Sequence, residues 1–139
     1  MSTIRYMESS ALVAALLEHD AAVMQAVPAG TRLVTSALTL AETARAIIRA
    51  HVTNRLTAEQ ERTAATALRT FARRCFVLDV DSRVLLHAGR RFPVEPVRTL
   101  DAVHLATVEW LEQPPDVVTI VTRDVRVRDN ALALGYRVA

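Results

Sequence analysis

The sequence contains no lysine, and all 17 of its basic residues are arginine. Receiver and phosphatase-like sites also place carboxylates at strand ends, but they rely on a lysine to hold the phosphoryl group, so its absence argues against both classes. Only three glycines occur, and they lie far apart, at Gly30, Gly89 and Gly135. A phosphate-binding loop needs clustered glycines that let the backbone approach the ligand. The sequence therefore lacks a nucleotide-cradling loop.

Cysteine, aromatic residues and long apolar runs are also scarce. The single Cys75 cannot form an intramolecular disulfide, and we expect it to be a buried thiol in a reducing cytoplasm. Two Tyr and one Trp are too few for an extended surface on which bases stack. The longest apolar run, residues 11–17, is far shorter than the roughly 20 residues of a membrane span, and no signal peptide is recognisable. We therefore expect a cytoplasmic protein that does not enter a membrane.

The composition is typical of one compact domain with a modest affinity for polyanions. The chain has 139 residues, of which 51% are hydrophobic and 23% charged, so it can bury a real core. A net charge of +2 and a pI near 9.3 fit a modest polyanion binder. The planar guanidinium of arginine can also bind a phosphate through two hydrogen bonds at once, which the ammonium group of lysine is less suited to do. We expect residues 1–139 to form a single domain.

Strand-like and helix-like segments alternate along the chain. Apolar patterns and turn residues predict strands at 3–7, 32–35, 76–79, 117–121 and 136–138. They predict helices at 10–27 (broken near His19), 39–51, 58–74, 82–91, 99–111 and 124–134. In the helix at 99–111, the residues expected to face inward are Leu100, Val103, Trp110 and Leu111. Strands separated by helices predict an α/β fold with a central parallel β-sheet of about five strands and helices on both faces.

Four carboxylates occupy positions where parallel α/β proteins build their sites. Glu8 follows the first predicted strand in "YMESSAL", and Asp124 ends a strand in "VTIVTRD". Glu42 lies within the first two turns of its helix in "SALTLAETARAI", and Asp101 opens a helix in "RTLDAVHLAT". The carboxyl ends of parallel strands and the adjoining helix starts form one edge with a crevice. Glu8 and Asp124 belong to this edge, whereas the edge that Asp101 faces depends on the topology.

Each acid, taken singly, also has an ordinary structural explanation. Asp124 is a favourable N-cap and Asp101 a favourable first-turn residue, so for these two a structural and a functional role are equally supported. Early acids such as Glu42 are common in helices. Glu8 is harder to explain in this way, because the two serines that follow it are the natural caps.

Taken together, the four acids indicate a hard divalent cation. Several carboxylates in one crevice repel one another unless a cation or protons intervene. Mg²⁺ and Mn²⁺ prefer oxygen ligands and keep waters for a phosphate substrate, and such a centre activates water at a phosphodiester. The four histidines show no zinc-like spacing. We expect His104, one helical turn after Asp101, to hydrogen-bond that carboxylate in a structural role.

The order of these motifs resembles that of the PIN-domain nucleases, above all the VapC-type toxins of bacterial VapBC toxin–antitoxin pairs. The resemblance covers nearly the whole chain, and the four motifs in this order are specific although each alone is weak. It implies a metal-dependent endoribonuclease that hydrolyses RNA with Mg²⁺ or Mn²⁺. It also implies a sheet between helices, a homodimer, and a cognate antitoxin that covers the acidic site.

Carried over residue by residue, the resemblance assigns metal binding and catalysis to the four acids. Glu42, Asp101 and Asp124 match the acids of the family's motifs. Glu8 stands where most members carry Asp, so its reach is longer by one methylene and the metal position can differ. By the same resemblance, Ser10 matches the hydroxyl near the first acid, and Thr122 the hydroxyl near the last.

Arginines beside the acidic motifs are candidates for phosphate contacts, although exposed arginines or arginines paired with an antitoxin explain them equally well. They are Arg5, Arg98, Arg123, Arg126 and Arg128. Two other functions stay open. One is a catalytically silent PIN domain that acts as a binding partner, and the other is an RNA-processing PIN nuclease without an antitoxin.

Overall fold

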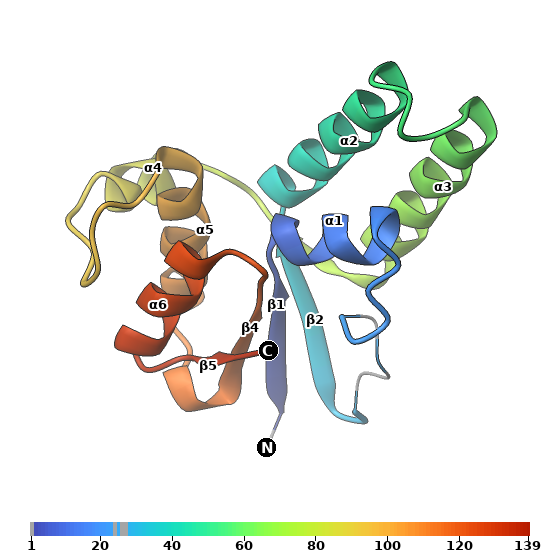
Figure 1. The fold of residues 1–139 in the computed structure, drawn as a ribbon. Coiled ribbons are helices and arrows are strands. Elements are labelled where there is room, and N and C mark those ends of the chain that lie inside the picture. Colours follow the sequence, from blue (N-terminus) through green and yellow to red (C-terminus); the bar gives the residue numbers. More distant parts are fainter. Residues whose placement is uncertain (1, 24, 26–27) are drawn as a thin grey trace.

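The computed structural model describes residues 2–23, 25 and 28–139, in which strands and helices alternate (Figure 1). The strands are β1 (Thr3–Met7), β2 (Thr31–Ser36), β3 (Phe76–Leu78), β4 (Val118–Val121) and β5 (Arg137–Val138). The helices are α1 (Ser9–Leu17), α2 (Ala37–Val52), α3 (Ala58–Arg74), α4 (Ser82–Ala88), α5 (Thr99–Glu109) and α6 (Val125–Ala133), and a 3₁₀ turn, Pro115–Val117, precedes β4. Every predicted strand and helix is present, and α1 differs most from its predicted bounds.

Within the described residues, five strands form one parallel sheet in the order β3-β2-β1-β4-β5, which confirms the predicted α/β fold. The central strand is β1, and its last residue, Met7, lies beside Thr35 of β2 and Val121 of β4. The carboxyl ends of these three strands therefore reach the same edge of the sheet.

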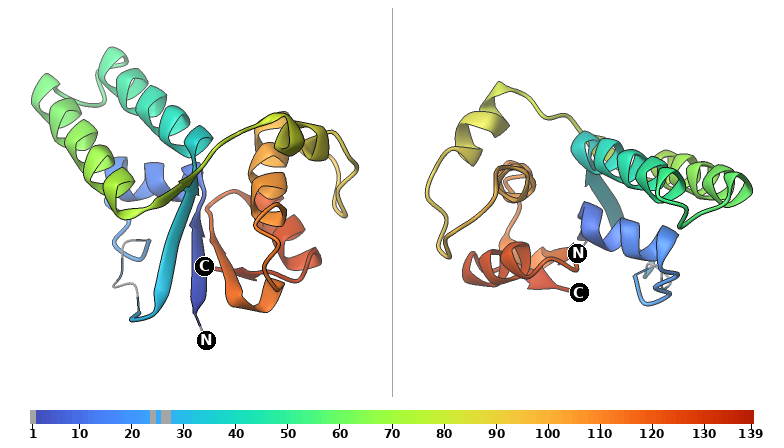
Figure 2. Two further views of the ribbon diagram at one scale, coloured as in Figure 1. Left: turned by 180° about the vertical axis from the view of Figure 1, so that it is seen from behind. Right: turned by 45° about the horizontal axis from the view of Figure 1, so that its top comes forward.

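Helices cover both faces of the sheet, as predicted. Alternate strand residues point to opposite faces. Ile4 and Tyr6 pack with apolar side chains of α5 and α6, whereas Met7 and Val121 pack with those of α1, α2 and α3. Figures 1 and 2 show these two groups of helices on either side of the strands. Burial of apolar surface on both faces stabilises the sheet and holds its carboxyl edge in place.

Helix α1 is much shorter than predicted. The backbone N–H groups of Glu18 and Asp20 both donate to the Ala14 carbonyl, at 3.0 and 3.1 Å. Between them, His19 has a φ of 53°, a left-handed conformation that closes the helix. The predicted break near His19 is confirmed, and the continuation of the helix beyond it is wrong. The predicted end at Val27 lies outside the described residues.

Helix α5 is buried on nearly all sides. Every residue from 101 to 108 is buried, because α4 and α6 pack against this helix and the sheet lies behind it. Leu100 and Trp110 are 48% and 40% exposed at the two ends of the helix, so the prediction that they face inward is wrong. The other two residues predicted to face inward pack against the core. Such surroundings give Asp101 and His104 fixed positions.

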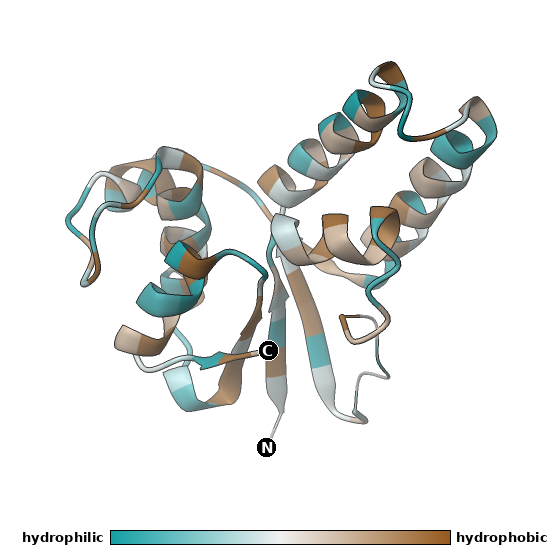
Figure 3. Cartoon of the chain, in the orientation of Figure 1, coloured by the Kyte–Doolittle hydropathy of each residue, from teal (hydrophilic) through white to brown (hydrophobic). Residues whose placement is uncertain are grey.

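Hydropathy follows the packing of the helices (Figure 3). Helix α1 is apolar along most of its length, whereas α2 and α3 carry hydrophilic residues between apolar ones. In the described part of the chain, no helix is both long and apolar enough to cross a membrane.

Cys75 is partly buried against the core beside α1, α2 and α3, and burial raises the pKa of its thiol to about 12. The thiol therefore stays protonated at neutral pH.

Candidate active site

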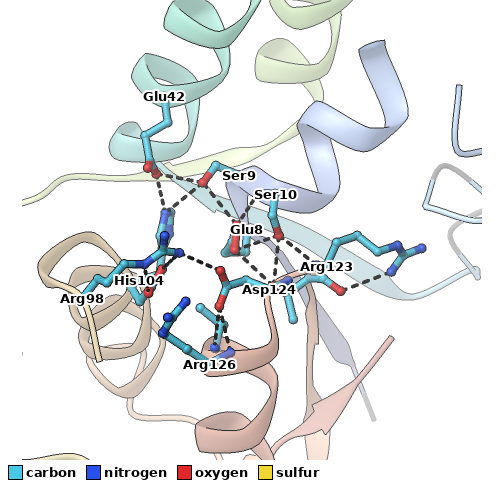
Figure 4. Close-up of polar contacts among 12 residues, drawn as sticks. Glu8, Ser9, Ser10, Glu42, Arg98, His104, Arg123, Asp124 and Arg126 are labelled. Atoms are coloured by element: carbon cyan, nitrogen blue, oxygen red, sulfur yellow. Dashed lines mark hydrogen bonds and ion pairs between the residues drawn. The ribbon is translucent and has the colours of Figure 1, made fainter. Parts of the chain in front are cut away.

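The four predicted acids line one cleft of about 670 Å³ at the carboxyl edge of the sheet. Figure 4 labels three of them, Glu8, Glu42 and Asp124. Glu8 comes directly after β1 and Asp124 directly before α6. Glu42 projects from the second turn of α2, and Asp101 from the first turn of α5. The topology thus brings Asp101 to the same edge as the other three acids. The arginines that line the cleft are Arg45, Arg49, Arg98 and Arg123.

Glu8 is 2% exposed and caps the N-terminus of α1. Its carboxylate accepts hydrogen bonds from the Ser10 backbone N–H and from the hydroxyls of Ser10 and Thr122, the latter two at 2.9 and 3.1 Å. The interpretation that the serines cap this helix without Glu8 is wrong, because the backbone at Glu8 is still extended (φ −87°, ψ 153°) while the serines are already helical. Glu8 therefore combines a structural role with a position in the cleft.

Glu42 is held by two donors inside the cleft. Ser9 Oγ and His104 Nε2 donate hydrogen bonds to its Oε1 at 2.8 and 2.6 Å. Burial raises the pKa of Glu42, but the hydrogen bonds from His104 and Ser9, with electrostatic attraction to His104 and Arg98, outweigh burial and lower the pKa below its ordinary value. The carboxylate is therefore ionised at neutral pH, and the proton of this contact resides on His104 Nε2.

His104 links Glu42 to the core of the sheet. It is 2% exposed, and its Nδ1 lies 2.8 Å from the hydroxyl of Tyr6 in β1. Burial raises the pKa of Tyr6 far above its ordinary value, so the phenol keeps its proton. The predicted hydrogen bond from His104 to Asp101 is absent from the described contacts, because Asp101 turns to Arg98 while His104 lies between β1 and α2. The buried chain Tyr6–His104–Glu42 positions the Glu42 carboxylate.

One guanidinium joins the other two acids. Arg98 Nε and Nη2 donate to the two carboxylate oxygens of Asp101 at 2.8 and 3.3 Å, and Nη2 also donates to Asp124 Oδ2 at 2.7 Å. Asp124 Oδ1 accepts the backbone N–H groups of Arg126 and Val127 at 2.9 and 3.1 Å. Asp124 is thus the N-cap of α6, as its position in the sequence suggested, and it also faces the cleft.

The two predicted supporting hydroxyls lie between Glu8 and Asp124. Ser10 Oγ and Thr122 Oγ1 are 3.2 Å apart, and both donate to Glu8. Thr122 Oγ1 also accepts the backbone N–H of Asp124 at 3.0 Å. These contacts tie the end of β1 to the end of β4 and fix the spacing of the two acids.

The predicted arginines occupy different places. Arg98 and Arg123 line the cleft. Arg123 Nε donates to Asp20 Oδ2 at 3.0 Å, and this hydrogen bond lowers the pKa of Asp20. Arg126, the second residue of α6, lies beside the acids in Figure 4. Arg5 lies within β1 and is not among the residues that line the cleft, so the structure gives it no place in the site.

The chemistry of the cleft fits a hard divalent cation, although its present geometry is not that of a finished metal site. All four acids offer carboxylate oxygens, the ligands that Mg²⁺ and Mn²⁺ prefer. Across residues 2–23, 25 and 28–139, no group of three His, Cys, Asp or Glu side chains is arranged to hold a metal ion. Arg98 supplies the positive charge between Asp101 and Asp124 instead. A metal ion shared by Asp101 and Asp124 would therefore compete with Arg98 for their carboxylate oxygens.

Comparison with known proteins assigns the chain to a family. Residues 5–131 match the PIN domain. The chain is 39% identical over 105 residues to Ribonuclease VapC46 of Mycobacterium tuberculosis, a match that covers 76% of this chain and 71% of that protein. The chain therefore belongs to the PIN domain family, in its VapC branch.

Solved structures share the fold across nearly the whole chain. VapBC2 from Rickettsia felis, bound to a DNA fragment from its promoter, has a TM-score of 0.68 at 14% identity and covers 98% of this chain and 97% of that chain. VapBC-1 from nontypeable Haemophilus influenzae has a TM-score of 0.59 at 16% identity, with 98% and 96% covered. PAE2754 from Pyrobaculum aerophilum has a TM-score of 0.58 at 20% identity, with 94% and 87% covered. At these identities the likeness concerns the fold alone.

Proposed function

We propose that the protein is a metal-dependent endoribonuclease and the toxin of a type II toxin–antitoxin pair. The observation that carries the proposal is the meeting of Glu8, Glu42, Asp101 and Asp124, from four separate segments, in one cleft. Placement in the VapC branch and the 39% identity to a protein named as a ribonuclease support RNA as the substrate.

In this proposal the four acids hold one or two Mg²⁺ or Mn²⁺ ions. When bound, the metal would neutralise charge on the phosphodiester and lower the pKa of water. Glu42 is already ionised and anchored by His104, so it needs no proton loss to serve as a ligand. Hydrolysis adds water across a P–O bond of the RNA backbone: the water oxygen bonds to phosphorus, and the leaving ribose oxygen takes up a proton.

Arginines around the acids are proposed to bind the RNA phosphates. Arg98 and Arg123 line the cleft, and Arg126 lies beside it. Arg45 and Arg49 of α2 also line the cleft and add further positive charge. Such contacts position the strand without reading its sequence. We therefore expect the shape of a folded RNA to decide which bond is cut.

The proposal includes protein partners. Two solved structures of the same fold are named as VapBC assemblies, and we propose a cognate antitoxin that covers the acidic cleft of this protein. We also propose a homodimer and a cytoplasmic location, which the placement among the VapC proteins supports.

Cleavage of a labelled structured RNA by the partner-free protein tests the proposed function. We expect cleavage with Mg²⁺ or Mn²⁺ and none with EDTA. A folded protein that binds its antitoxin but cleaves none of a broad set of RNAs in either metal would contradict the proposal and support a silent binding domain.

Replacing Glu8 with Asp is expected to keep or raise the cleavage rate. Aspartate is among the best N-cap residues, so α1 still begins correctly, and the carboxylate moves to the length most members of the family use. Glu8→Gln is the matched control, since it keeps the length of the side chain but removes the charge, and we expect it to lose about 100-fold in rate. Initial rates with Mn²⁺ measure both. A complete loss in Glu8→Asp, with an unchanged melting temperature, would show that the site needs the longer acid.

A further inference from the structure

Arg98 bridges two of the proposed metal ligands through a single guanidinium (Figure 4). Its side chain is 62% exposed, whereas those of Asp101 and Asp124 are 9% and 17% exposed. Asp101 is set in the buried helix α5, and Asp124 is fixed as the cap of α6. The acids are therefore the rigid part of this contact, and the arginine is the part that can move.

The guanidinium uses the oxygens that a metal would need. Arg98 donates to both oxygens of Asp101 and to Oδ2 of Asp124. The other oxygen of Asp124 is engaged by two backbone N–H groups of α6. A cation that binds Asp101 and Asp124 together would therefore compete with Arg98 for these carboxylate oxygens.

The Arg98 side chain can move away from the two acids without disturbing helix α5. Its backbone occupies the N-cap position of α5, and its side chain makes no capping hydrogen bond to that helix. The Arg98 guanidinium is positively charged at neutral pH, as every arginine side chain is. Without metal, it offsets the repulsion between the two acids.

We propose that Arg98 is an internal counter-cation that holds Asp101 and Asp124 together until a divalent metal displaces it. The inference rests on the metal site of the proposed function. After displacement the guanidinium would still lie at the wall of the cleft, free to bind a phosphate of the RNA through two hydrogen bonds. Arg98 thus acts as a positioning residue that passes from the acids to the substrate as metal binds.

Mn²⁺ binding to the full chain, followed by electron paramagnetic resonance and by titration calorimetry, tests the inference. Arg98→Ala removes the competitor and is expected to bind Mn²⁺ about tenfold more tightly than the wild type, the scale of two partly exposed ion pairs. Arg98→Lys keeps the charge but loses the planar guanidinium that contacts both acids at once. Its Mn²⁺ affinity is therefore expected to lie between those of the wild type and Arg98→Ala. Unchanged or weaker binding in Arg98→Ala overturns the inference.

Arg126→Ala is the matched control. It also removes one positive charge beside the acids, but in the described part of the chain its guanidinium takes part in none of the ion pairs. We expect its Mn²⁺ affinity to change less than about threefold, because a charge without direct contact is screened. An increase equal to that of Arg98→Ala would show a general charge effect and overturn the displacement.

Heat denaturation measures how much Mn²⁺ raises the Tm, a gain that would be the same with and without Arg98 if this arginine had only a structural role. In EDTA, Arg98→Ala is expected to melt below the wild type, because Asp101 and Asp124 then repel each other. Added Mn²⁺ is expected to raise the Tm of Arg98→Ala by more than that of the wild type. If Arg98 were purely structural, its loss would lower the Tm by the same amount in EDTA and in Mn²⁺. If the wild type binds Mn²⁺ and Arg98→Ala shows no larger gain, only the inference fails. If no variant and no wild type binds Mn²⁺, the metal site of the proposed function fails with it.

Discussion

Replacing Asp101 or Asp124 with Asn is expected to lower the rate of RNA cleavage by about 1,000-fold or more while the fold persists. Asparagine keeps the size of the side chain but not its negative charge, so the site loses an ionic ligand. Asn is as good an N-cap as Asp, and the start of α6 should therefore survive in Asp124→Asn. The ion pair between Arg98 and Asp101 is open to water on the arginine side, so its loss costs little stability.

Asp129→Asn is the matched control for these variants. Asp129 lies on α6 outside the cleft, and its carboxylate is 3.8 Å from Arg128 at the surface. We expect its rate to equal that of the wild type. Initial rates with Mn²⁺, together with circular dichroism and melting curves, separate lost chemistry from lost structure. Retention of more than about a tenth of the activity in both cleft variants would remove Asp101 and Asp124 from the catalytic site.

Replacing His104 with Ala is expected to reduce cleavage by about 10- to 100-fold, the usual effect of losing a group that orients a metal ligand. Glu42 then keeps Ser9 as a donor but loses the 2.6 Å contact that fixes it against the sheet. Stability should also fall by about 3 kcal/mol, because the buried hydroxyl of Tyr6 loses its partner and a cavity opens beside it. Urea denaturation measures this loss.

Tyr6→Phe separates the two effects of the His104 variant. It removes the hydroxyl at the far end of the chain Tyr6–His104–Glu42 and leaves the contact between His104 and Glu42 in place. We expect a loss of about 1 kcal/mol in stability and less than about a threefold change in rate. Wild-type activity in a folded His104→Ala protein would show that Glu42 needs no anchor and would contradict its proposed role.

The order of the elements and the four acids could be predicted from sequence, because both depend on local patterns. Glu8 and Asp124 follow strands, and in a parallel sheet this alone directs them to one edge. Asp101 could not be assigned to that edge without the topology, since α5 follows helix α4 through residues 89–98 and does not come directly after a strand. The inward face of α5 was mispredicted at Leu100 and Trp110 because a helix buried on nearly all sides carries no amphipathic signal.

Contacts between segments that are distant along the chain could not be predicted from the sequence. The partner of His104 was expected one helical turn away, at Asp101, yet its partners are Tyr6 and Glu42, 98 and 62 residues away along the chain. Ser9 was treated only as a helix cap, although it donates to Glu42 and contacts His104. The pair of serines after Glu8 was the signal available, and it did not reveal which hydroxyl reaches which acid.

The most direct test of the account is the chemical nature of the ends that cleavage leaves. The acidic cleft is proposed to promote attack by water on the phosphodiester, so each cut should leave a phosphomonoester on one product and a free hydroxyl on the other. Mass spectrometry of RNA cut by the partner-free protein with Mn²⁺ measures this, with Asp101→Asn as the blank. Linear phosphate ends that form only with metal, and not in the variant, are the predicted result. A 2′,3′-cyclic phosphate, or equal cleavage in EDTA, would mean that the neighbouring ribose hydroxyl attacks and would contradict hydrolysis at this site.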